Sequence, residues 1–198
     1  MKIIGLCGGS GSGKGCVCKI LSQIGFKTID TDGVYHDLIS EDSECTFELA
    51  SAFGEQIRSY PGINRARLRE VVFSSRDNLD RLNKITHKHI LNAVRKVINS
   101  VSSDPSILGV VIDAPLLFES GFDKECDVTI AVLADKDVRI ERIIERDGIS
   151  REAAALRINS QISDRDLIGK CTYHVYNNSD LDALESTVRE LCENIIDK

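Results

Sequence analysis

The feature that most constrains this chain is a glycine-rich segment near its start, GGSGSGK at residues 8–14. An apolar run at residues 3–7 precedes the segment, and apolar residues from Val17 to Ile24 follow it at helical spacing. A strand, a glycine loop and a helix in this order cradle phosphate groups, because glycine lets successive backbone N–H groups point inward and the helix N-terminus adds positive potential. The pattern therefore predicts a nucleoside triphosphate site.

Two features of the loop bear on what it binds. Lys14 holds the position from which a lysine reaches the terminal phosphates, and Gly15 stands where a Ser or Thr that holds Mg²⁺ is usual. A turn that only caps a helix needs one or two glycines, whereas residues 8–15 contain five. No window between residues 8 and 16 matches the G-x-G-x-x-G fingerprint of dinucleotide sites. The residues expected to bind the nucleotide are Gly8, Gly9, Ser10, Gly11, Ser12, Gly13, Lys14, Gly15 and Cys16.

Composition narrows the class of protein. The 198 residues are enough for one domain with inserted parts and a sizeable core. The net charge is −6 and no basic block occurs, which argues against nucleic acid as a partner, because binding to a phosphate backbone needs clustered Lys and Arg. No stretch is long enough to span a bilayer, and the N-terminal apolar run is too short for a signal peptide. We expect a cytoplasmic protein without a membrane partner, a monomer or weak homo-oligomer, whose seven cysteines are reduced thiols.

A pair of aspartates follows the second predicted strand, which covers residues 27–30. In parallel α/β sheets ligands collect at the carboxyl ends of strands, so these carboxylates are expected on the same rim as the glycine loop. Asp32 is a candidate base that accepts the proton of an attacking hydroxyl. Alternatively, Asp32 or Thr31 only caps the helix that begins near Val34. Spacing alone does not decide between the two.

Residues 33–103 form a helical insertion. They carry no strand pattern as strong as those of the core, and helical patterns fill residues 35–39, 47–53, 65–73 and 79–101, with a turn at residues 59–62. An insertion of this length is expected to cover the substrate. Arg65 is a candidate anion-binding residue, although a solvated helix face also accounts for an arginine there. His87 and His89 are two residues apart and cannot share one helix face, so a metal pair is not expected.

A third strand at residues 107–113 is almost wholly apolar and ends in Asp113, as a central parallel strand does. A strand-end aspartate in such a protein faces the Mg²⁺ side of the nucleotide. A role as a helix cap is weak, because Pro115 follows closely and lacks an N–H. Residues 116–121 then run across the same rim.

Arginines dominate the part of the chain after the fourth strand, which covers residues 127–133. Arg142 and Arg146 are four apart on a predicted helix and present one cationic edge. A second helix, capped by Ser150, runs through Arg157 and Gln161. The pair is typical of a lid that closes over phosphates and excludes water. A solvent-exposed helix pair held by Arg–Glu ion pairs is the alternative.

A fifth strand at residues 173–177 and a closing amphipathic helix at residues 181–196 complete the chain. Together the patterns predict an α/β fold, namely a three-layer α/β/α P-loop domain with a five-stranded parallel sheet, a helical substrate-binding insertion and an arginine-rich helical lid. The single domain, residues 1–198, is expected to have its core at about 1–32, 104–138 and 171–198, its insertion at 33–103 and its lid at 139–170.

With these residues in place, the chain resembles a dephospho-coenzyme A kinase nearly from end to end. The segments that carry the resemblance are GLCGGSGSGK at 5–14, IDTD at 29–32, R-x-x-L at 65–68 with His87, DAPLLFESG at 113–121, R-x-x-x-R at 142–146 and R-I-x-x-Q at 157–161. The segment at 113–121 is the most telling, since generic P-loop kinases do not share it. The family usually has Ser or Thr at Gly15, Thr at Cys16, Pro at Lys88 and Gln at Arg139; the last two differences are expected to be peripheral to the chemistry.

The resemblance implies transfer of the γ-phosphoryl group of ATP to the ribose 3′-hydroxyl of dephospho-CoA, giving CoA and ADP in the last step of coenzyme A biosynthesis. Its cofactors would be ATP and Mg²⁺, with Asp113 supporting the metal through water. Asp32 would be the catalytic base, with Lys14 and Arg142 as further catalytic residues and Arg146 and Asn178 also at the nucleotide. The residues implied to bind the acceptor are Asp32, Arg65, His87, Leu116, Phe118, Glu119, Arg157 and Gln161.

Two other functions fit parts of the pattern. A different nucleotide or nucleoside kinase would use the same frame. A nucleotide-binding regulator without catalysis is conceivable because of Gly15, but intact Lys14, Asp32 and Asp113 argue against it. A GTPase would need an Asn-Lys-x-Asp motif, which the sequence lacks.

Overall fold

The computed structural model describes residues 1–196, and the chain divides into two compact units. The first comprises Met1–Ile29 and the residues from Asp104 onward, and the second comprises Asp30–Ser103. Each unit has its own hydrophobic core.

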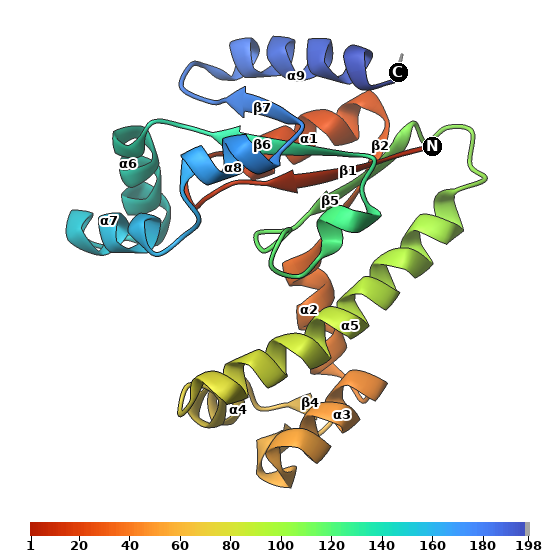
Figure 1. Ribbon diagram of the computed structural model, residues 1–198, viewed down its shortest axis with the longest axis vertical. Helices are drawn as coiled ribbons and strands as arrows, with labels where there is room; N and C mark the ends of the chain where they lie inside the picture. The colour runs from red at the N-terminus through yellow and green to blue at the C-terminus, as the bar shows by residue number, and fades with distance from the viewer. Residues whose placement is uncertain (197–198) are drawn as a thin grey trace. The chain divides into compact units, whose positions relative to one another are not determined.

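The first unit is built on a five-stranded parallel sheet, as predicted. Its strands are β1 (Lys2–Cys7), β2 (Phe26–Asp30), β5 (Gly109–Asp113), β6 (Val128–Leu133) and β7 (Tyr173–Tyr176), in the order β2-β5-β1-β6-β7 (Figure 1). The central strand β1 lies between β5 and β6, with Leu6 opposite both Asp113 and Ile130. Because neighbouring strands run in the same direction, the loops that follow β1, β5 and β6 leave the sheet at one rim.

Apolar side chains of the sheet pack under two helices, α1 (Lys14–Ile24) and α9 (Leu181–Ile196), which lie side by side. Leu21 from α1 and Val188 from α9 join Ile4, Val111 and Ile130 of the sheet in this core. Each of these side chains is almost completely buried, and such burial stabilises the fold by about 1.5–3 kcal/mol per large apolar side chain. The helix α9 has the predicted bounds.

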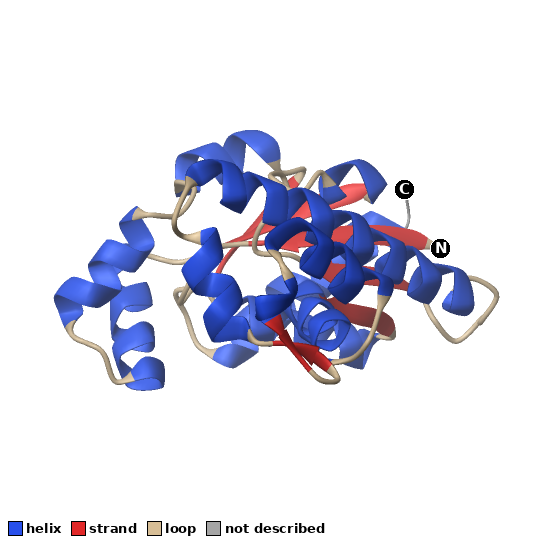
Figure 2. Ribbon diagram, turned by 90° about the horizontal axis from the view of Figure 1, so that it is seen from below, coloured by secondary structure: helices blue, strands red, loops and turns tan. Residues whose placement is uncertain are grey.

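The lid region contains three helices rather than the two predicted. Helices α6 (Lys136–Asp147) and α7 (Arg151–Asn159) form a hairpin, in which Gly148 adopts a left-handed conformation and the Ser150 side chain caps α7. Figure 2 shows helices without strands at this end of the unit. Ile140, Ile143, Ala154 and Ile158 give the hairpin a small core of its own. The unpredicted helix α8 (Asp164–Lys170) follows, and a 3₁₀ turn, η2 (Phe122–Glu125), lies between β5 and β6.

The second unit is mainly helical. Its elements are α2 (Thr31–Ser40), α3 (Glu44–Phe53), the 3₁₀ turn η1 (Glu55–Ile57), β3 (Arg58–Ser59), β4 (Gly62–Ile63), α4 (Arg65–Val72) and α5 (Arg76–Val101). The predicted turn at residues 59–62 joins β3 and β4 in a short antiparallel hairpin, which the sequence patterns did not indicate. Side chains of Ser43, Asn64 and Ser75 cap α3, α4 and α5, and explain where these helices begin.

The start of α2 corrects one alternative left open by the sequence. The helix begins at Thr31, and its cap is Asp30, whose Oδ1 accepts the N–H of Asp32 at 3.0 Å. Neither Thr31 nor Asp32 is the cap. Asp32 instead lies in the first turn with its side chain exposed, where a carboxylate is also favoured by the helix dipole.

Candidate functional site

The glycine loop between β1 and α1 has the geometry of an anion cradle. Gly11 and Gly13 have φ angles of 77° and 94°, in the left-handed region that favours glycine. The N–H of Ser12 donates to Gly9 O at 3.1 Å, and the buried Ser12 Oγ has no hydrogen-bond partner among the described residues. Helix α1 starts at Lys14; the N–H groups of Cys16 and Val17 donate to Gly13 O at 2.9 and 3.3 Å, whereas those of Lys14 and Gly15 have no acceptor within the helix. Phosphate oxygens are natural acceptors for them.

Lys14 and Asp113 meet beside the loop. Lys14 Nζ lies 3.4 Å from Asp113 Oδ1, and both side chains are about four-fifths buried. Cys18 Sγ donates to Asp113 Oδ2 at 3.6 Å. The carboxylate stands at the end of β5, beside β1, which is where the strand pattern placed it.

The site fits a hard metal ion held partly by water. Asp113 supplies the carboxylate oxygen that Mg²⁺ prefers. No heavy atom lies within 4 Å of the position that a Cβ would take at Gly15, so there is open space where the usual hydroxyl would stand. Water can fill this space. Cys16, the next residue, is exposed.

Arg142 reaches the loop from the lid, together with a residue that sequence reasoning missed. Arg142 Nη1 donates to Gly11 O at 3.3 Å, and its Nη2 lies 3.4 Å from Asn177 Oδ1. Asn177 is 5% exposed and donates from Nδ2 to Ser12 O at 2.9 Å. Asn177 directly follows β7, and its position at the end of a predicted strand is the feature of the sequence that could have indicated it. The predicted neighbour Asn178 instead accepts the N–H of Asp135 at 2.8 Å, just before α6.

Arg139 and Gln161 also contact the loop. Arg139 Nε donates to Ser10 O at 2.9 Å, and Gln161 Oε1 accepts the N–H of Ser10 at 2.9 Å. The expectation that the difference at Arg139 is peripheral is therefore wrong, because the side chain is 4% exposed and packed on the nucleotide loop. Gln161, expected at the acceptor, lies against Ser10 here.

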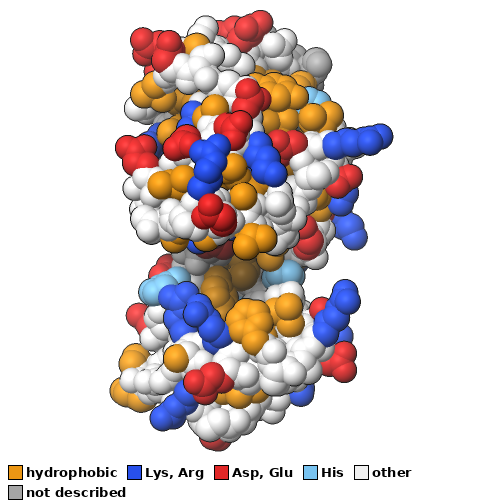
Figure 3. Space-filling model, turned by 90° about the vertical axis from the view of Figure 1, so that its left-hand side faces the viewer, with side chains coloured by type: hydrophobic (Ala, Val, Ile, Leu, Met, Phe, Trp, Pro, Cys, Tyr) orange, Lys and Arg blue, Asp and Glu red, His pale blue; other side chains and the backbone are white. Residues whose placement is uncertain are grey.

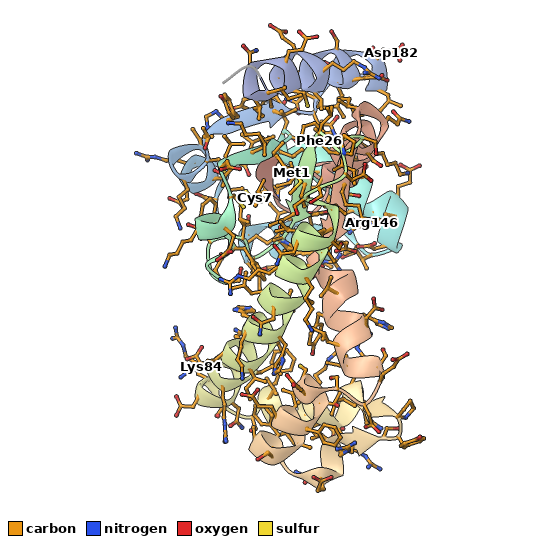
Figure 4. All side chains as sticks on the ribbon, turned by 90° about the vertical axis from the view of Figure 1, so that its right-hand side faces the viewer. Met1, Cys7, Phe26, Lys84, Arg146 and Asp182 are labelled. Carbon is orange, nitrogen blue, oxygen red and sulfur yellow. The ribbon has the colours of Figure 1, made fainter. Side chains whose placement is uncertain are left out.

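Two other lid arginines bind within the lid. Arg146 donates from Nε to Asp147 Oδ1 at 2.7 Å, and Arg157 forms an ion pair with Asp147 Oδ2. The hydrogen bond from Arg146, with a second from Arg157, lowers the pKa of Asp147 to about 2. Arg142 and Arg146 thus do not act as one cationic edge in this structure. Figure 4 labels Arg146 on the lid, and Figure 3 shows acidic and basic side chains interspersed on a face of this unit.

Residues 116–119, which follow β5, lie partly on the surface. Leu116 is 50% exposed, Glu119 is exposed, and Leu117 between them is fully buried. Phe118 is half-buried, with Lys170 Nζ 5.2 Å from its ring centre. The exposed apolar side chain of Leu116 is available to a ligand.

In the second unit, Arg65 lines a cavity of about 170 Å³. Tyr35, Arg65 and Arg69 line it together with apolar side chains of α4 and α5, including Leu68 and Leu82. Tyr35 follows Asp32 by three residues on α2, so the two lie on neighbouring positions of one helix face. Burial raises the pKa of Tyr35.

His87 and His89, which both lie on α5, have different surroundings. His87 is half-buried. His89 is 7% exposed, and its Nε2 lies 2.7 Å from Glu48 Oε2, which also accepts from Lys88 Nζ at 2.8 Å. Hydrogen bonds from Lys88 and His89 lower the pKa of Glu48. This cluster links α3 to α5, and within residues 1–196 no group of three or more His, Cys, Asp or Glu is placed to hold a metal.

Comparison with known proteins agrees with this geometry. The family model described as dephospho-CoA kinase matches residues 2–183. Curated dephospho-CoA kinases of Fusobacterium nucleatum and Dehalococcoides mccartyi are 42% and 34% identical over 194 residues; the alignments cover 98% of this chain in both cases, and 98% and 97% of the relatives. The solved dephospho-CoA kinase of Campylobacter jejuni shares the fold, with a TM-score of 0.71 at 23% identity, covering 98% of this chain and 97% of that one. The chain belongs to the dephospho-CoA kinase family of ATP-dependent phosphotransferases.

Proposed function

We propose that this chain phosphorylates the ribose 3′-hydroxyl of dephospho-CoA with ATP, giving CoA and ADP, and that the residues gathered at the glycine loop form its ATP site. The observation that carries the proposal is the convergence of Lys14, Asp113, Arg142 and Asn177 on that loop at the start of α1. Three elements supply these residues besides the loop itself. The acceptor, dephospho-CoA, is inferred from membership of the family.

The ATP half acts by positioning and by electrostatics. Lys14 and the first N–H groups of α1 bind the β- and γ-phosphates, and Arg142 adds a guanidinium that stabilises charge on the transferring group. Asp113 would hold Mg²⁺ through water, and the open space at Gly15 would admit a water where a hydroxyl ligand is usual. When bound, the metal neutralises charge on the phosphates.

Most of the acceptor half is assigned to the second unit. Asp32 orients the ribose hydroxyl and accepts its proton as the hydroxyl oxygen bonds to the γ-phosphorus and the bond to the β–γ bridging oxygen breaks. Arg65 and Arg69, which line one cavity, would bind the diphosphate of dephospho-CoA, and the apolar wall of that cavity suits its pantetheine arm. His87, Leu116, Phe118 and Glu119 are proposed as further acceptor contacts.

The lid arginines have unequal roles in this proposal. Arg142 already contacts the loop. Arg146 and Arg157 must leave Asp147 before they can reach a phosphate, so their binding roles require a rearrangement of the lid.

Substrate choice is tested by measuring ADP formation with dephospho-CoA, AMP, CMP and nucleosides as acceptors. We expect turnover with dephospho-CoA to exceed that with the other acceptors by about a hundredfold or more in kcat/KM. Comparable turnover with AMP or CMP would favour a nucleotide kinase, and ATP binding without turnover on any acceptor would favour a regulator.

The ATP site is tested by Lys14→Met. We expect kcat/KM for ATP to fall by about a hundredfold or more, since a buried charge on the phosphates is removed. Lys19→Met is the matched control, because Lys19 is an exposed lysine on the same helix. Equal activity of the two variants would contradict the assignment.

We further infer a cytoplasmic protein that acts as a monomer or weak homo-oligomer. All seven cysteines are free thiols, which suits a reducing compartment. None of the helices within residues 1–196 combines the length and apolar character needed to cross a membrane. Analytical ultracentrifugation over a range of concentrations tests the oligomeric state.

A further inference from the structure

The peptide units on both sides of Ser10, in the nucleotide loop, are held from outside the loop. Arg139 Nε donates to Ser10 O at 2.9 Å, while Gln161 Oε1 accepts the N–H of Ser10 at 2.9 Å. Arg139 Nη2 also lies 3.3 Å from the same Gln161 oxygen, and Gln161 Nε2 donates to Ser10 Oγ at 3.2 Å. Residues of α6 and of the segment after α7 therefore hold both polar groups of Ser10 and its side chain.

Arg139 is buried with a counter-ion. Its side chain is 4% exposed, and Nη1 lies 3.0 Å from Asp164 Oδ1 at the start of α8. A buried guanidinium needs such a partner, because an unpaired charge in the interior is strongly unfavourable. One planar group thus joins the nucleotide loop, Gln161 and Asp164.

The loop is shaped to fit over this side chain. A Cβ at Gly9 would overlap the Arg139 guanidinium, and a Cβ at Gly11 would lie 2.6 Å from the backbone oxygen of Arg139. Arg139 therefore fills the space that a side chain at Gly9 or Gly11 would need, and the φ of 77° at Gly11 favours glycine there as well.

We propose that Arg139 is a positioning residue for ATP, acting through Ser10 with Gln161 as its partner. The N–H of Ser10 is engaged by Gln161 and that of Ser12 by Gly9, so phosphate binding depends on the donors that follow, at the start of α1. Holding Ser10 fixes the turn that aims those donors. This inference rests on the proposed ATP site but not on the identity of the acceptor.

In this chain neither lysine nor glutamine would make all the contacts of this guanidinium. Arginine presents several N–H donors in one plane and so reaches Ser10 O, Gln161 and Asp164 at once, whereas a lysine ammonium is a compact point charge. A glutamine lacks the charge that Asp164 neutralises. We therefore expect both substitutions to weaken ATP binding without affecting the acceptor.

The test compares Arg139→Gln, Arg139→Lys and Gln161→Met with Arg151→Gln as the matched control. Arg151 is a half-exposed arginine of the same helical hairpin, and it pairs with Asp137 and Glu141. The measurements are the ATP Kd by calorimetry without acceptor, KM for each substrate, and Tm. A merely structural role would lower Tm and the active fraction, but would leave the Kd and both KM values of the folded molecules unchanged.

We expect the Kd and KM for ATP to rise about tenfold or more in the three test variants, corresponding to loss of a charge-assisted hydrogen bond. KM for dephospho-CoA should stay within about twofold, and Arg151→Gln should match the parent. An unchanged ATP Kd in folded Arg139→Gln overturns the proposal. If neither Arg139 variant folds, Gln161→Met decides by the same criterion. A parent that binds ATP but does not phosphorylate dephospho-CoA refutes the proposed acceptor, while the calorimetric test of Arg139 still stands.

Discussion

The position of the Asp32 side chain is set by its neighbours in the sequence. Asp30 supplies the cap of α2, and the Asp32 carboxylate is exposed in the first turn of that helix. A carboxylate in this position is a candidate to accept a proton from a substrate hydroxyl.

The role of Asp32 can be checked by Asp32→Asn. We expect kcat to fall about a hundredfold or more, since a general base contributes this much, while the Kd for ATP stays within about twofold. Asp37→Asn on the same helix, which changes a highly exposed carboxylate, should behave as the parent. Steady-state kinetics and calorimetry distinguish the two. Near-parental turnover of Asp32→Asn would rule out the base.

Gly15 offers a second experiment at the scale of one residue. A Cβ there meets no atom within 4 Å, so Gly15→Ser should fold and place a hydroxyl where the family usually has one. We expect the Mg²⁺ concentration for half-maximal activity to fall several-fold, and stability to rise by about 0.5 kcal/mol from helix propensity. Gly15→Ala is the control for propensity alone. If Ser and Ala give the same Mg²⁺ titration, the hydroxyl does not reach the metal.

Motif spacing could predict the kind of chemistry at the site, but not every contact that shapes it. Lys14 and Asp113 were predictable, since each sits at a recognisable strand end or loop. Asn177 and Arg139 were not, because Asn177 contacts Ser12 and Arg139 contacts Ser10 from far along the chain. A pattern read along the sequence carries no information about which distant side chain fills a buried gap.

Among the elements, those with strong apolar patterns were predictable. The strands of the sheet and helix α9 follow from runs or periods of buried apolar residues. The short helix α8 and the hairpin of β3 and β4 were missed, because four to seven residues hold too little of a period. Caps moved the starts of α2 and α3 earlier than the apolar pattern implied.

The lid hairpin should respond to acid through Asp147. Its folded pKa is about 2, below the ordinary value of 3.8, so the ionised carboxylate contributes stability that is present above about pH 4 and lost as the pH falls towards 2. At pH 7 we expect Asp147→Asn to melt about a degree or two lower than the parent, with the gap closing as the pH is lowered through 4. Glu145→Gln, an exposed acid on α6, is the control. A gap that does not depend on pH would exclude this ion pair as the cause.

At the scale of the whole molecule, the proposed ATP contacts lie in the first compact unit, and most of the proposed acceptor contacts lie in the second. We expect ATP with Mg²⁺ to slow hydrogen exchange in the glycine loop and α6, and dephospho-CoA to slow it within residues 30–103 and at residues 116–119. At a ligand concentration of 100 times Kd, linkage adds about 2.7 kcal/mol of stability. Mass spectrometry of the exchanged peptides measures which residues each ligand protects from exchange. Protection of residues 30–103 by ATP alone would contradict the division of roles.

The order of the strands has a consequence for how such an enzyme can change over evolution. Strands β2 and β5 are neighbours in the sheet, yet residues 31–108 lie between them in the chain. This segment, which contains the proposed base Asp32 and the proposed acceptor contact Arg65, thus enters and leaves between two adjacent strands, and the glycine loop, Asp113 and the lid all lie outside it. Insertions, deletions or exchanges in that segment leave the hydrogen-bonded ladder and the residues proposed for ATP unchanged. A chain with this connectivity can change most of the residues proposed for its acceptor by replacing one continuous stretch.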